Sequence, residues 1–314
     1  MRYQHLFGPV LSRRLGISLG VDLVTHKICS LNCVYCECGG TTFLTKERKE
    51  YVSCETVCRE LDHYWAHHDD PDYITFSGSG EPTLNPALGQ VIVHIKNSKP
   101  DIRVAVLTNA TLISDPGVRS DLALADIVVP SVDAVSPKVF SRINRPCAGI
   151  PPRQIVDGIA GFAKDFAGEI WLEIFILPGM NDTREELQML KAAIGKIQPH
   201  RVQLNTLDRP GTVSSLRPAS PEELERVIRI LDEKNVEIIA QAGTRNKGIK
   251  MEDPASAVLE TIHRRPCTKQ DLSAILGLPA EEIDLLLAEL LAAGSVISRT
   301  QARGVFFSTR KGDT

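Results

Sequence analysis

The sequence predicts an α/β protein: a partial (β/α)6 barrel of the TIM type at residues 1–250, then a small winged-helix domain at residues 251–314. Three observations support this prediction. Short apolar runs alternate with helical patterns, polar residues recur where the runs end, and the alternation stops near Pro254. Such alternation is typical of a parallel sheet covered by helices, whose strand ends gather ligand-binding groups.

The chain of 314 residues is 43% hydrophobic and carries a formal net charge of -3. This composition suffices for a large core, and the near-neutral charge excludes a general attraction to nucleic acid or anionic membrane. No apolar run reaches membrane-spanning length and the N-terminus has no signal-peptide core, so we expect a cytoplasmic protein without membrane contact. In that reducing compartment the eight cysteines are expected as ligands, reactive groups or core residues rather than disulfides.

The expected elements begin with a bent strand or hairpin at residues 7–20, where three glycines interrupt an apolar segment. Later strands are expected at residues 21–28, 73–76, 102–107, 126–130, 170–177, 202–204 and 236–240. Helices are expected at residues 53–68, 86–96, 153–166, 184–197 and 221–234. Two of these begin with capping boxes, formed by Thr183 with Glu186 and by Ser220 with Glu223.

Cys29, Cys33 and Cys36 lie within eight residues and precede Cys38-Gly39-Gly40. Three cysteine ligands on a four-iron cluster would leave one iron open to a small molecule, as catalysis requires. Two alternatives remain. The spacing i, i+4, i+7 also fits a buried helical stripe, although polar residues and glycines interrupt it. A four-cysteine zinc site would need Cys38, whose one-residue gap from Cys36 is short for that purpose.

The segment Gly78-Ser79-Gly80-Glu81 follows the strand expected at 73–76. Its small residues allow close backbone approach to a ligand, and its carboxylate could bind an ammonium group. Because the carboxyl ends of parallel strands meet at one edge of a sheet, polar residues after the later strands should share one pocket with this loop. These residues are Thr108, Asn109, Ser131, Asp133, Asn181, Asp182 and Asn205.

These features resemble the radical S-adenosylmethionine (SAM) superfamily over roughly residues 19 to 210. The C-x3-C-x2-C loop, with aromatic Tyr35 before its last cysteine, matches the signature of that family, and Ser79-Gly80-Glu81 is similar to its glycine-glycine-glutamate motif. The resemblance implies that Cys29, Cys33 and Cys36 hold a 4Fe-4S cluster whose open iron is chelated by SAM. It assigns the SAM contacts to Tyr35, Gly78, Ser79, Gly80, Glu81, Thr108, Asn109, Ser131, Asp133, Glu173 and Asn205.

The resemblance also implies the reaction. An electron from the cluster cleaves SAM to methionine and a 5'-deoxyadenosyl radical, which abstracts hydrogen from a substrate. No flavodoxin-like or cobalamin-binding domain is evident, so an external electron donor of the flavodoxin or ferredoxin type is implied. Residues 8–16, 143–146 and 203–210 further resemble radical SAM proteins similar to wyosine-tRNA synthases.

No catalytic residue can be assigned from the sequence; the candidates are Cys147, Arg145 and Arg13. Whether a second cluster is present stays undecided; its ligands would come from Cys38, Cys54, Cys58 and Cys147. A tRNA or protein substrate is favoured because an appended winged helix suits a large partner, while a small-molecule substrate stays open. A non-enzymatic, zinc-containing winged-helix regulator is the alternative from another class.

The winged helix is predicted from helices at residues 255–265, 269–276 and 280–293 and a hairpin at 295–308. The helix in the recognition position carries four acidic residues and no lysine or arginine, so it would repel phosphates and a DNA major groove is a doubtful target. The basic hairpin and tail, with Arg299, Arg303, Arg310 and Lys311, leave an RNA or acidic-peptide contact open. A structural cap or dimerisation module is the simpler alternative.

Overall fold

A computed structural model describes residues 3–12, 14–213, 215–239, 254–301 and 304–309. Its largest sheet has eight strands in the order β1-β2-β5-β6-β7-β8-β9-β10. All neighbours from β2 to β10 are parallel, and β1 pairs antiparallel with β2. The strands are β1 (Leu6–Ser12), β2 (Gly16–Val21), β5 (Tyr73–Phe76), β6 (Arg103–Thr108), β7 (Ile127–Pro130), β8 (Glu169–Phe175), β9 (Arg201–Asn205) and β10 (Val236–Ile238). The predicted α/β fold with a mostly parallel, partial-barrel sheet is confirmed.

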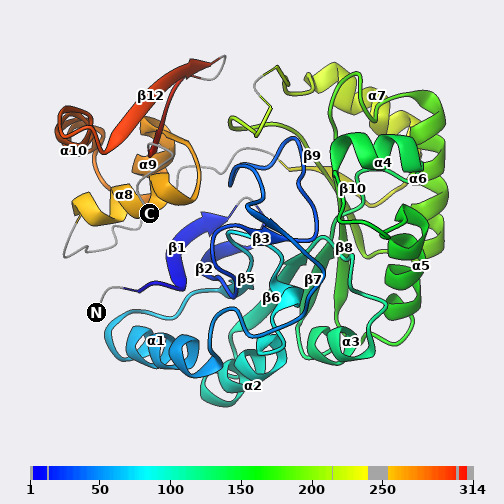
Figure 1. Ribbon diagram of the computed structural model, residues 1–314, viewed down its shortest axis with the longest axis horizontal. Coiled ribbons are helices and arrows are strands. Elements are labelled where there is room, and N and C mark those ends of the chain that lie inside the picture. The colour runs from blue at the N-terminus through cyan, green and yellow to red at the C-terminus, as the bar shows by residue number, and fades with distance from the viewer. Residues whose placement is uncertain (1–2, 13, 214, 240–253, 302–303, 310–314) are drawn as a thin grey trace.

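Helices cover the outer side of this sheet, and the strands curve around the middle of the molecule (Figure 1). The apolar side chains of strands and helices meet in one large core, in which Val104, Val128 and Ile174 are fully buried. The helices are α1 (Cys54–His67), the short η1 (Pro82–Leu84), α2 (Leu88–Ser98), α3 (Pro116–Leu122), α4 (Pro137–Ile143), α5 (Pro152–Ala163), α6 (Arg184–Ile197) and α7 (Pro221–Leu231). The short α3 and α4 were not expected, because two turns give little periodicity to recognise.

The first core strand differs from its prediction. The sequence predicted a strand over residues 21–28, but β2 ends at Val21 and the separate two-residue strand β3 (Ile28–Cys29) pairs with β4 (Phe43–Leu44). The Asp22 carboxylate explains the break, since it accepts hydrogen bonds from the backbone of Val24 at 3.3 Å and of Ser79 at 2.8 Å. The apolar run was therefore two segments joined by a turn. The expected hairpin at residues 7–20 corresponds to β1 and β2.

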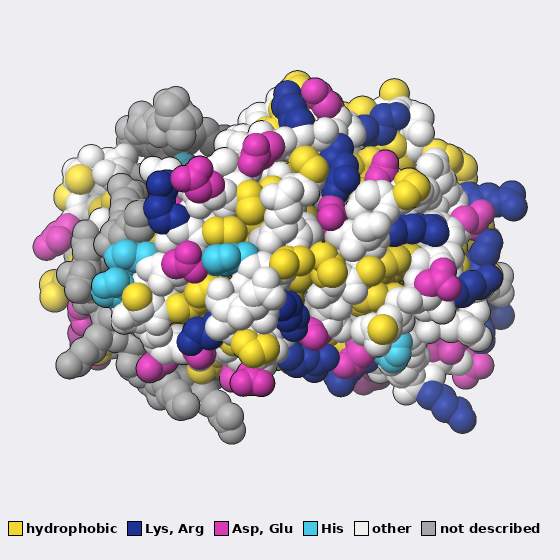
Figure 2. Space-filling view, turned by 90° about the horizontal axis from the view of Figure 1, so that it is seen from below, with side chains coloured by type: hydrophobic (Ala, Val, Ile, Leu, Met, Phe, Trp, Pro, Cys, Tyr) yellow, Lys and Arg dark blue, Asp and Glu magenta, His cyan; other side chains and the backbone are white. Residues whose placement is uncertain are grey.

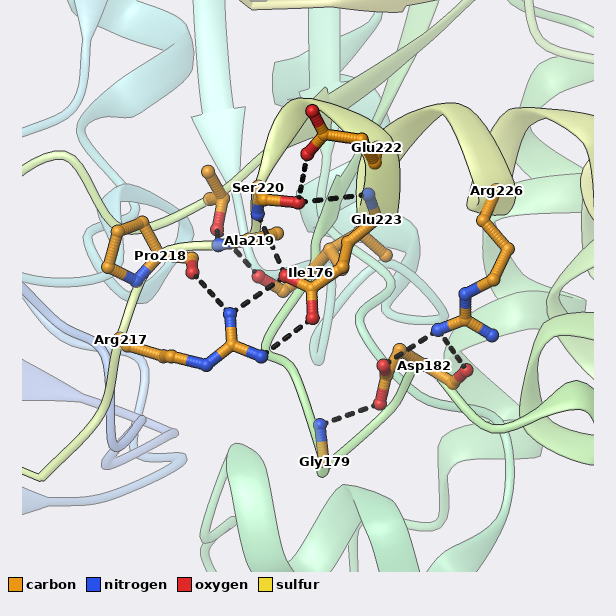
Figure 3. A network of polar contacts seen from close by, with 11 residues as sticks. Ile176, Gly179, Asp182, Arg217, Pro218, Ala219, Ser220, Glu222, Glu223 and Arg226 are labelled. Carbon is orange, nitrogen blue, oxygen red and sulfur yellow. Dashed lines mark hydrogen bonds and ion pairs between the residues drawn. The ribbon is translucent and has the colours of Figure 1, made fainter.

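The two predicted capping boxes have different outcomes. Ser220 and Glu223 form a complete box at the start of α7, and Arg217 holds the Glu223 carboxylate through two hydrogen bonds of 2.7 and 2.6 Å. Figure 3 shows this contact beside the Arg226–Asp182 ion pair. The box of Thr183 and Glu186 is only half formed. The Glu186 carboxylate instead accepts hydrogen bonds from the backbone of Val135 and Ser136, so it supports the start of α4.

The C-terminal part has its own small core and a three-stranded antiparallel sheet in the order β11-β13-β12. Helix α9 of this part lies against β1 of the large sheet. The elements are α8 (Pro254–Arg264), β11 (Cys267–Thr268), α9 (Lys269–Leu276), α10 (Ala280–Ala292), β12 (Val296–Gln301) and β13 (Gly304–Thr309). The three helices and the hairpin predicted here are present.

The surface mixes charges of both signs. Figure 2, which views the molecule from below, shows Lys and Arg side chains interspersed with Asp and Glu over the face drawn. Within the described residues, no helix combines the length and the apolar character needed to cross a bilayer.

Candidate active site

The loop from Cys29 to Cys36 is held by backbone hydrogen bonds from a distant segment, residues 143–147. Asn32 donates to the carbonyl of Asn144 at 2.9 Å, and Val34 donates to the carbonyl of residue 143 at 2.9 Å. In return, Cys147 donates its backbone N–H to the carbonyl of Ser30 at 2.9 Å. These contacts fix a loop that contains little regular structure of its own.

Each of the three loop thiols accepts a hydrogen bond from a different side chain. Asn109 donates to Cys29 at 3.5 Å and Asn144 donates to Cys33 at 3.4 Å. The buried Lys27 ammonium lies 2.6 Å from the sulfur of Cys36. Hydrogen bonds to sulfur and nearby charge are two of the means by which proteins set the potential of iron–sulfur clusters.

The pKa values of these thiols diverge. Burial raises the pKa of Cys29 to about 12 and also raises that of Cys33. The hydrogen bond from the Cys38 thiol lowers the pKa of Cys36, and the Lys27 cation adds to this effect against burial, giving a value of about 6. The Cys38 thiol and the Lys27 cation thus favour the thiolate form of Cys36, which is the form that binds metal.

The donor set fits an iron–sulfur cluster. The loop presents three half-buried thiols, and none of the eight cysteines in the chain forms a disulfide. In the part of the chain that the structure describes, no three His, Cys, Asp or Glu side chains are grouped to hold one metal ion. A four-iron cluster does not require that grouping, because each cysteine binds a different iron.

The Glu81 carboxylate is 2% exposed and is used within the protein. One oxygen accepts hydrogen bonds from the hydroxyls of Thr83 and Thr108, both at 2.6 Å, and the other accepts from the backbone of Asn109 at 2.8 Å. It therefore joins the loop after β5 to the end of β6. The expected ammonium contact through this carboxylate stays a prediction.

Gly80 brings this loop against the start of the cysteine loop. A Cβ atom on Gly80 would lie 1.8 Å from the carbonyl oxygen of Ile28, a separation that atoms cannot adopt. Glu81 also donates its backbone N–H to that carbonyl at 3.1 Å. Glycine is thus required here for close approach of two backbones. Gly78 has a φ of +119°, which also favours glycine.

Asp133 is 3% exposed and organises the other side of the cysteine loop. Its oxygens accept hydrogen bonds from the Tyr35 hydroxyl at 2.5 Å, the Asn144 amide at 2.7 Å and the Phe175 backbone at 2.9 Å. Burial raises the pKa of this carboxyl to about 6. The Tyr35 ring stacks on the Phe175 ring with centroids 3.9 Å apart.

A cavity of about 600 Å³ lies between the large sheet and α9. This volume falls within the range of small-molecule sites, roughly 300–1,000 Å³. Arg14 forms an ion pair with Glu173 and donates to Gln203 at 3.0 Å. The polar and aromatic lining residues from the sheet side include Arg14, Tyr35, Cys36, Glu37, Glu173, Phe175 and Asn205. The lining residues from the C-terminal part, polar and apolar together, are Arg265, Thr268, Gln270, Asp271, Ala274 and Ile275.

Arg209 connects the cysteine loop to α9. Its side chain is 8% exposed and lies 3.2 Å from Glu37 and 3.5 Å from Asp271. Burial alone would lower the pKa of Arg209, but the two carboxylates raise it overall. Glu37 directly follows Cys36, and Asp271 lies in the first turn of α9. Sequence reasoning gave this arginine no role, because its partners are distant in the chain; its place after the end of β9 was the available signal.

The residues predicted from the sequence thus fall into separate groups. Tyr35, Glu173 and Asn205 line the large cavity. A smaller cavity of about 50 Å³ beside Cys33 is lined by residues that include Asn109, Ser131 and Asp133. Thr108 and Glu81 bond to each other in the core.

Two of the three catalytic candidates, Arg145 and Cys147, do not line the large cavity. Arg145 is exposed, with a φ of +45°, and Cys147 is half-buried beside the cysteine loop. Arg13 lies outside the described residues. The neighbouring Arg14 lines the cavity. The sulfur atoms of Cys54 and Cys58 are 3.8 Å apart on α1, and neither residue lines the large cavity.

Comparison with known proteins agrees with this geometry. The model of the radical SAM superfamily matches residues 23–190, and the chain therefore belongs to this superfamily. It is a radical SAM enzyme whose cofactors are a 4Fe-4S cluster and SAM.

The similar relatives include proteins named UPF0026. One from Methanocaldococcus jannaschii is 34% identical over 72% of this chain and 71% of its own length. Another from Helicobacter pylori is 32% identical over 86% of this chain and 87% of its own. A protein of Brachyspira hyodysenteriae named GTPase Obg is 34% identical over 94% of this chain, which spans 44% of that protein.

Solved structures share the fold at low identity. A radical SAM methyltransferase from Sphaerobacter thermophilus has a TM-score of 0.56 and 15% identity, covering 70% of this chain and 65% of its own. The structure of TYW1 with a lysine-pyruvate adduct has a TM-score of 0.52 and 18% identity, covering 69% of this chain and 74% of its own.

Proposed function

We propose that Cys29, Cys33 and Cys36 hold the 4Fe-4S cluster and that SAM cleavage there yields a 5'-deoxyadenosyl radical, which abstracts hydrogen from a substrate in the cavity beneath α9. The observation that carries this proposal is the position of the cysteine loop at the wall of that cavity, where Cys36 contributes to the lining. The chain's own residues bind, orient and shield the reactants.

Each neighbouring residue receives a role from its contacts. Lys27, Asn109 and Asn144 donate to the three sulfurs and tune the cluster. Because the Glu81 carboxylate is only 2% exposed, we assign the ammonium contact of SAM to backbone groups of Gly78, Ser79 and Gly80. The hydrogen bond from the Thr108 hydroxyl to the Glu81 carboxylate holds that loop against the end of β6.

The remaining SAM contacts are assigned to the cavity wall. The stacked Tyr35 and Phe175 offer a flat apolar surface for adenine, and Glu173 and Asn205 offer polar groups for the ribose and carboxylate. Asp133 acts as a positioning residue for Tyr35, since its oxygens are engaged within the protein. Ser131 lies with Asp133 at the small cavity beside Cys33.

For the substrate we propose a macromolecule, a tRNA or a protein, that inserts one base or side chain. A cavity of about 600 Å³ that also holds SAM leaves room for a single small group. The resemblance of three sequence segments to wyosine-tRNA-synthase-like proteins supports RNA. The buried Arg209 contact, which closes the cavity with α9, favours a small-molecule substrate as the second candidate.

We further propose a barrel domain at residues 1–250 and a winged-helix domain at 251–314. The chain order of three helices, a short strand after the first and a terminal hairpin supports a winged helix. Helix α10 carries Glu281, Glu282, Asp284 and Glu289, which argues against DNA binding through that helix. An external flavodoxin- or ferredoxin-type donor and a cytoplasmic location complete the proposal, since the cluster requires reduction and a reducing environment.

Anaerobic reconstitution tests this assignment. The wild-type chain should bind about four iron atoms and cleave SAM when reduced with dithionite. The Cys33→Ala variant should lose both properties, whereas Cys54→Ala, which alters a half-buried thiol on α1, should keep them. Undiminished iron in Cys33→Ala would refute the ligand assignment. Stoichiometric zinc with no SAM turnover would instead support the alternative of a non-enzymatic, zinc-containing winged-helix regulator.

A further inference from the structure

An exposed apolar strand lies beside the first cysteine of the loop. Leu44 of β4 is paired with Cys29 of β3, and Thr45 donates its backbone N–H to the Cys29 carbonyl at 3.0 Å. Phe43 is 47% exposed and Leu44 is 41% exposed. One strand of backbone therefore separates the proposed cluster ligand from an apolar surface open to a partner.

Positive charges flank this strand. The Lys49 ammonium lies 5.9 Å from the centroid of the Phe43 ring and 5.3 Å from that of Tyr51. Lys46 is exposed, and a Cβ atom built on Gly149 would lie 3.4 Å from its ammonium nitrogen. Lys46 thus lies beside the turn of residues 145–149, which is hydrogen-bonded to the cysteine loop.

Ion pairs cancel only part of the positive charge of this region. Among the described residues, Lys46 and the exposed Arg145 form no ion pair with an acidic side chain, and Lys49 contacts Glu47 at 3.4 Å with both side chains at least half exposed. Glu50, the other acid nearby, is exposed and accepts a hydrogen bond from the start of α1, so Lys46, Lys49 and Arg145 outnumber the two carboxylates beside them. We call the exposed set Phe43, Leu44, Lys46, Lys49 and Arg145 the donor surface.

We propose that the donor surface docks an acidic protein that carries one electron at low potential. An apolar centre with a positively charged rim fits the small, transient interfaces of electron-transfer partners, where opposite charges speed the encounter. In the docked pair one electron leaves the carrier and enters the cluster. The carrier is oxidised by one electron, the cluster is reduced by one, and no bond or proton is transferred.

The location separates reduction from substrate binding. No member of the donor surface lines the cavity of about 600 Å³, whereas Cys36 does. A carrier on this surface would approach the cluster loop from the side of Cys29, so it need not compete with a substrate. This inference rests on the proposed function, because it requires a cluster at Cys29, Cys33 and Cys36. It also gives Arg145, which lies outside the cavity, a role in binding the carrier.

The test compares carrier-driven with chemically driven SAM cleavage in the reconstituted enzyme. The probes are reduced flavodoxin and reduced ferredoxin, with dithionite as the small reductant. The variant Lys46→Glu/Lys49→Glu should lower the carrier-driven rate at limiting carrier about tenfold or more at low salt, because it reverses two steering charges. Its affinity for oxidised flavodoxin, measured by titration calorimetry, should fall together with the salt dependence of binding. Dithionite-driven cleavage and iron content should stay as in the wild type.

Lys164→Glu is the control for a charge reversal elsewhere on the surface. This exposed lysine follows α5 and precedes β8, so it lies at the opposite edge of the sheet from the cysteine loop. Its carrier-driven rate should equal that of the wild type. The variant Phe43→Ser/Leu44→Ser keeps all charges and should weaken carrier binding through lost apolar contact.

Carrier binding and carrier-driven rates that are unchanged in both double variants would overturn the donor surface. A wild-type enzyme that fails to cleave SAM even with dithionite would refute the proposed function itself, so the two failures are distinguishable. An effect of Lys164→Glu equal to that of the double variant would show a general charge effect and would also overturn the proposal.

Discussion

Replacement of Arg209 by methionine should loosen the C-terminal part from the cysteine loop. The substitution removes a buried cation and leaves the carboxylates of Glu37 and Asp271, whose side chains are only 21% and 11% exposed, without their shared partner. Breaking a buried ion pair on one side destabilises by about 3 kcal/mol or more, because a buried charge is left behind. That free energy corresponds to roughly a hundredfold change in an equilibrium.

The effect should be measured at α9. The C-terminal part is small and its core contains few buried residues. The protection of its amides from hydrogen exchange therefore depends on packing against the large sheet. Amide hydrogen exchange followed by mass spectrometry should therefore show residues 269–276 exchanging up to roughly a hundred times faster in Arg209→Met. The cavity beneath α9 should become accessible together with this change.

Arg226→Met is the control, because Arg226 also pairs with an aspartate, Asp182, but is 42% exposed (Figure 3). Surface pairs of this kind contribute at most about 1 kcal/mol. The double variant Arg209→Met/Asp271→Asn should recover part of the lost protection, since the charge of one of the two carboxylates is removed. Exchange at α9 in Arg209→Met within twofold of the wild type would refute the reasoning that this arginine joins the two parts.

Three further changes have distinct expected outcomes. Gly80→Ala should prevent cluster assembly, measured as iron content, because its Cβ would lie 1.8 Å from the carbonyl oxygen of Ile28; Gly195→Ala on α6, which meets nothing within 4 Å, should retain iron. Asp133 has a pKa raised by burial to about 6, so the apo-protein should gain about 1 kcal/mol in free energy of unfolding as the pH falls from about 7 to about 5. The folded state binds this proton more tightly than the unfolded state, and a urea titration of Asp133→Asn that kept the full pH dependence would contradict the assignment. Lys27→Met should shift the cluster potential to more negative values by tens of millivolts, since a cation 2.6 Å from a ligand sulfur is lost, and an unchanged midpoint in a potentiometric titration would argue against this role.

The elements of the fold were largely predictable because their signals are local. Ser220 and Glu223 lie three residues apart and form the predicted box, since both partners belong to the same helical turn. Thr183 and Glu186 have the same spacing, yet Glu186 bonds to Val135 and Ser136, about 50 residues earlier in the chain. A local pattern predicts the helix start but cannot reveal a competing partner that only folding supplies.

The same limit applies to the polar strand ends. Their common location was predictable, because parallel strands deliver their carboxyl ends to one edge. Which of them would face the cavity was not. The Asp133 carboxylate accepts hydrogen bonds from Tyr35 and Asn144 within the protein. Glu173 and Asn205, in contrast, line the large cavity.

The sequence by itself determined the superfamily, the three cysteines and the alternation of strands and helices, because these depend on spacing along a few adjacent residues. Only the tertiary structure decided that Glu81 is an internal acceptor, that Arg209 joins Glu37 to Asp271, and that α9 closes the cavity. The physical reason is that a side chain's chemistry depends on which groups share its surroundings in the folded molecule. Burial and hydrogen-bond partners, which set charge, pKa and availability, come from segments that lie far apart in the chain.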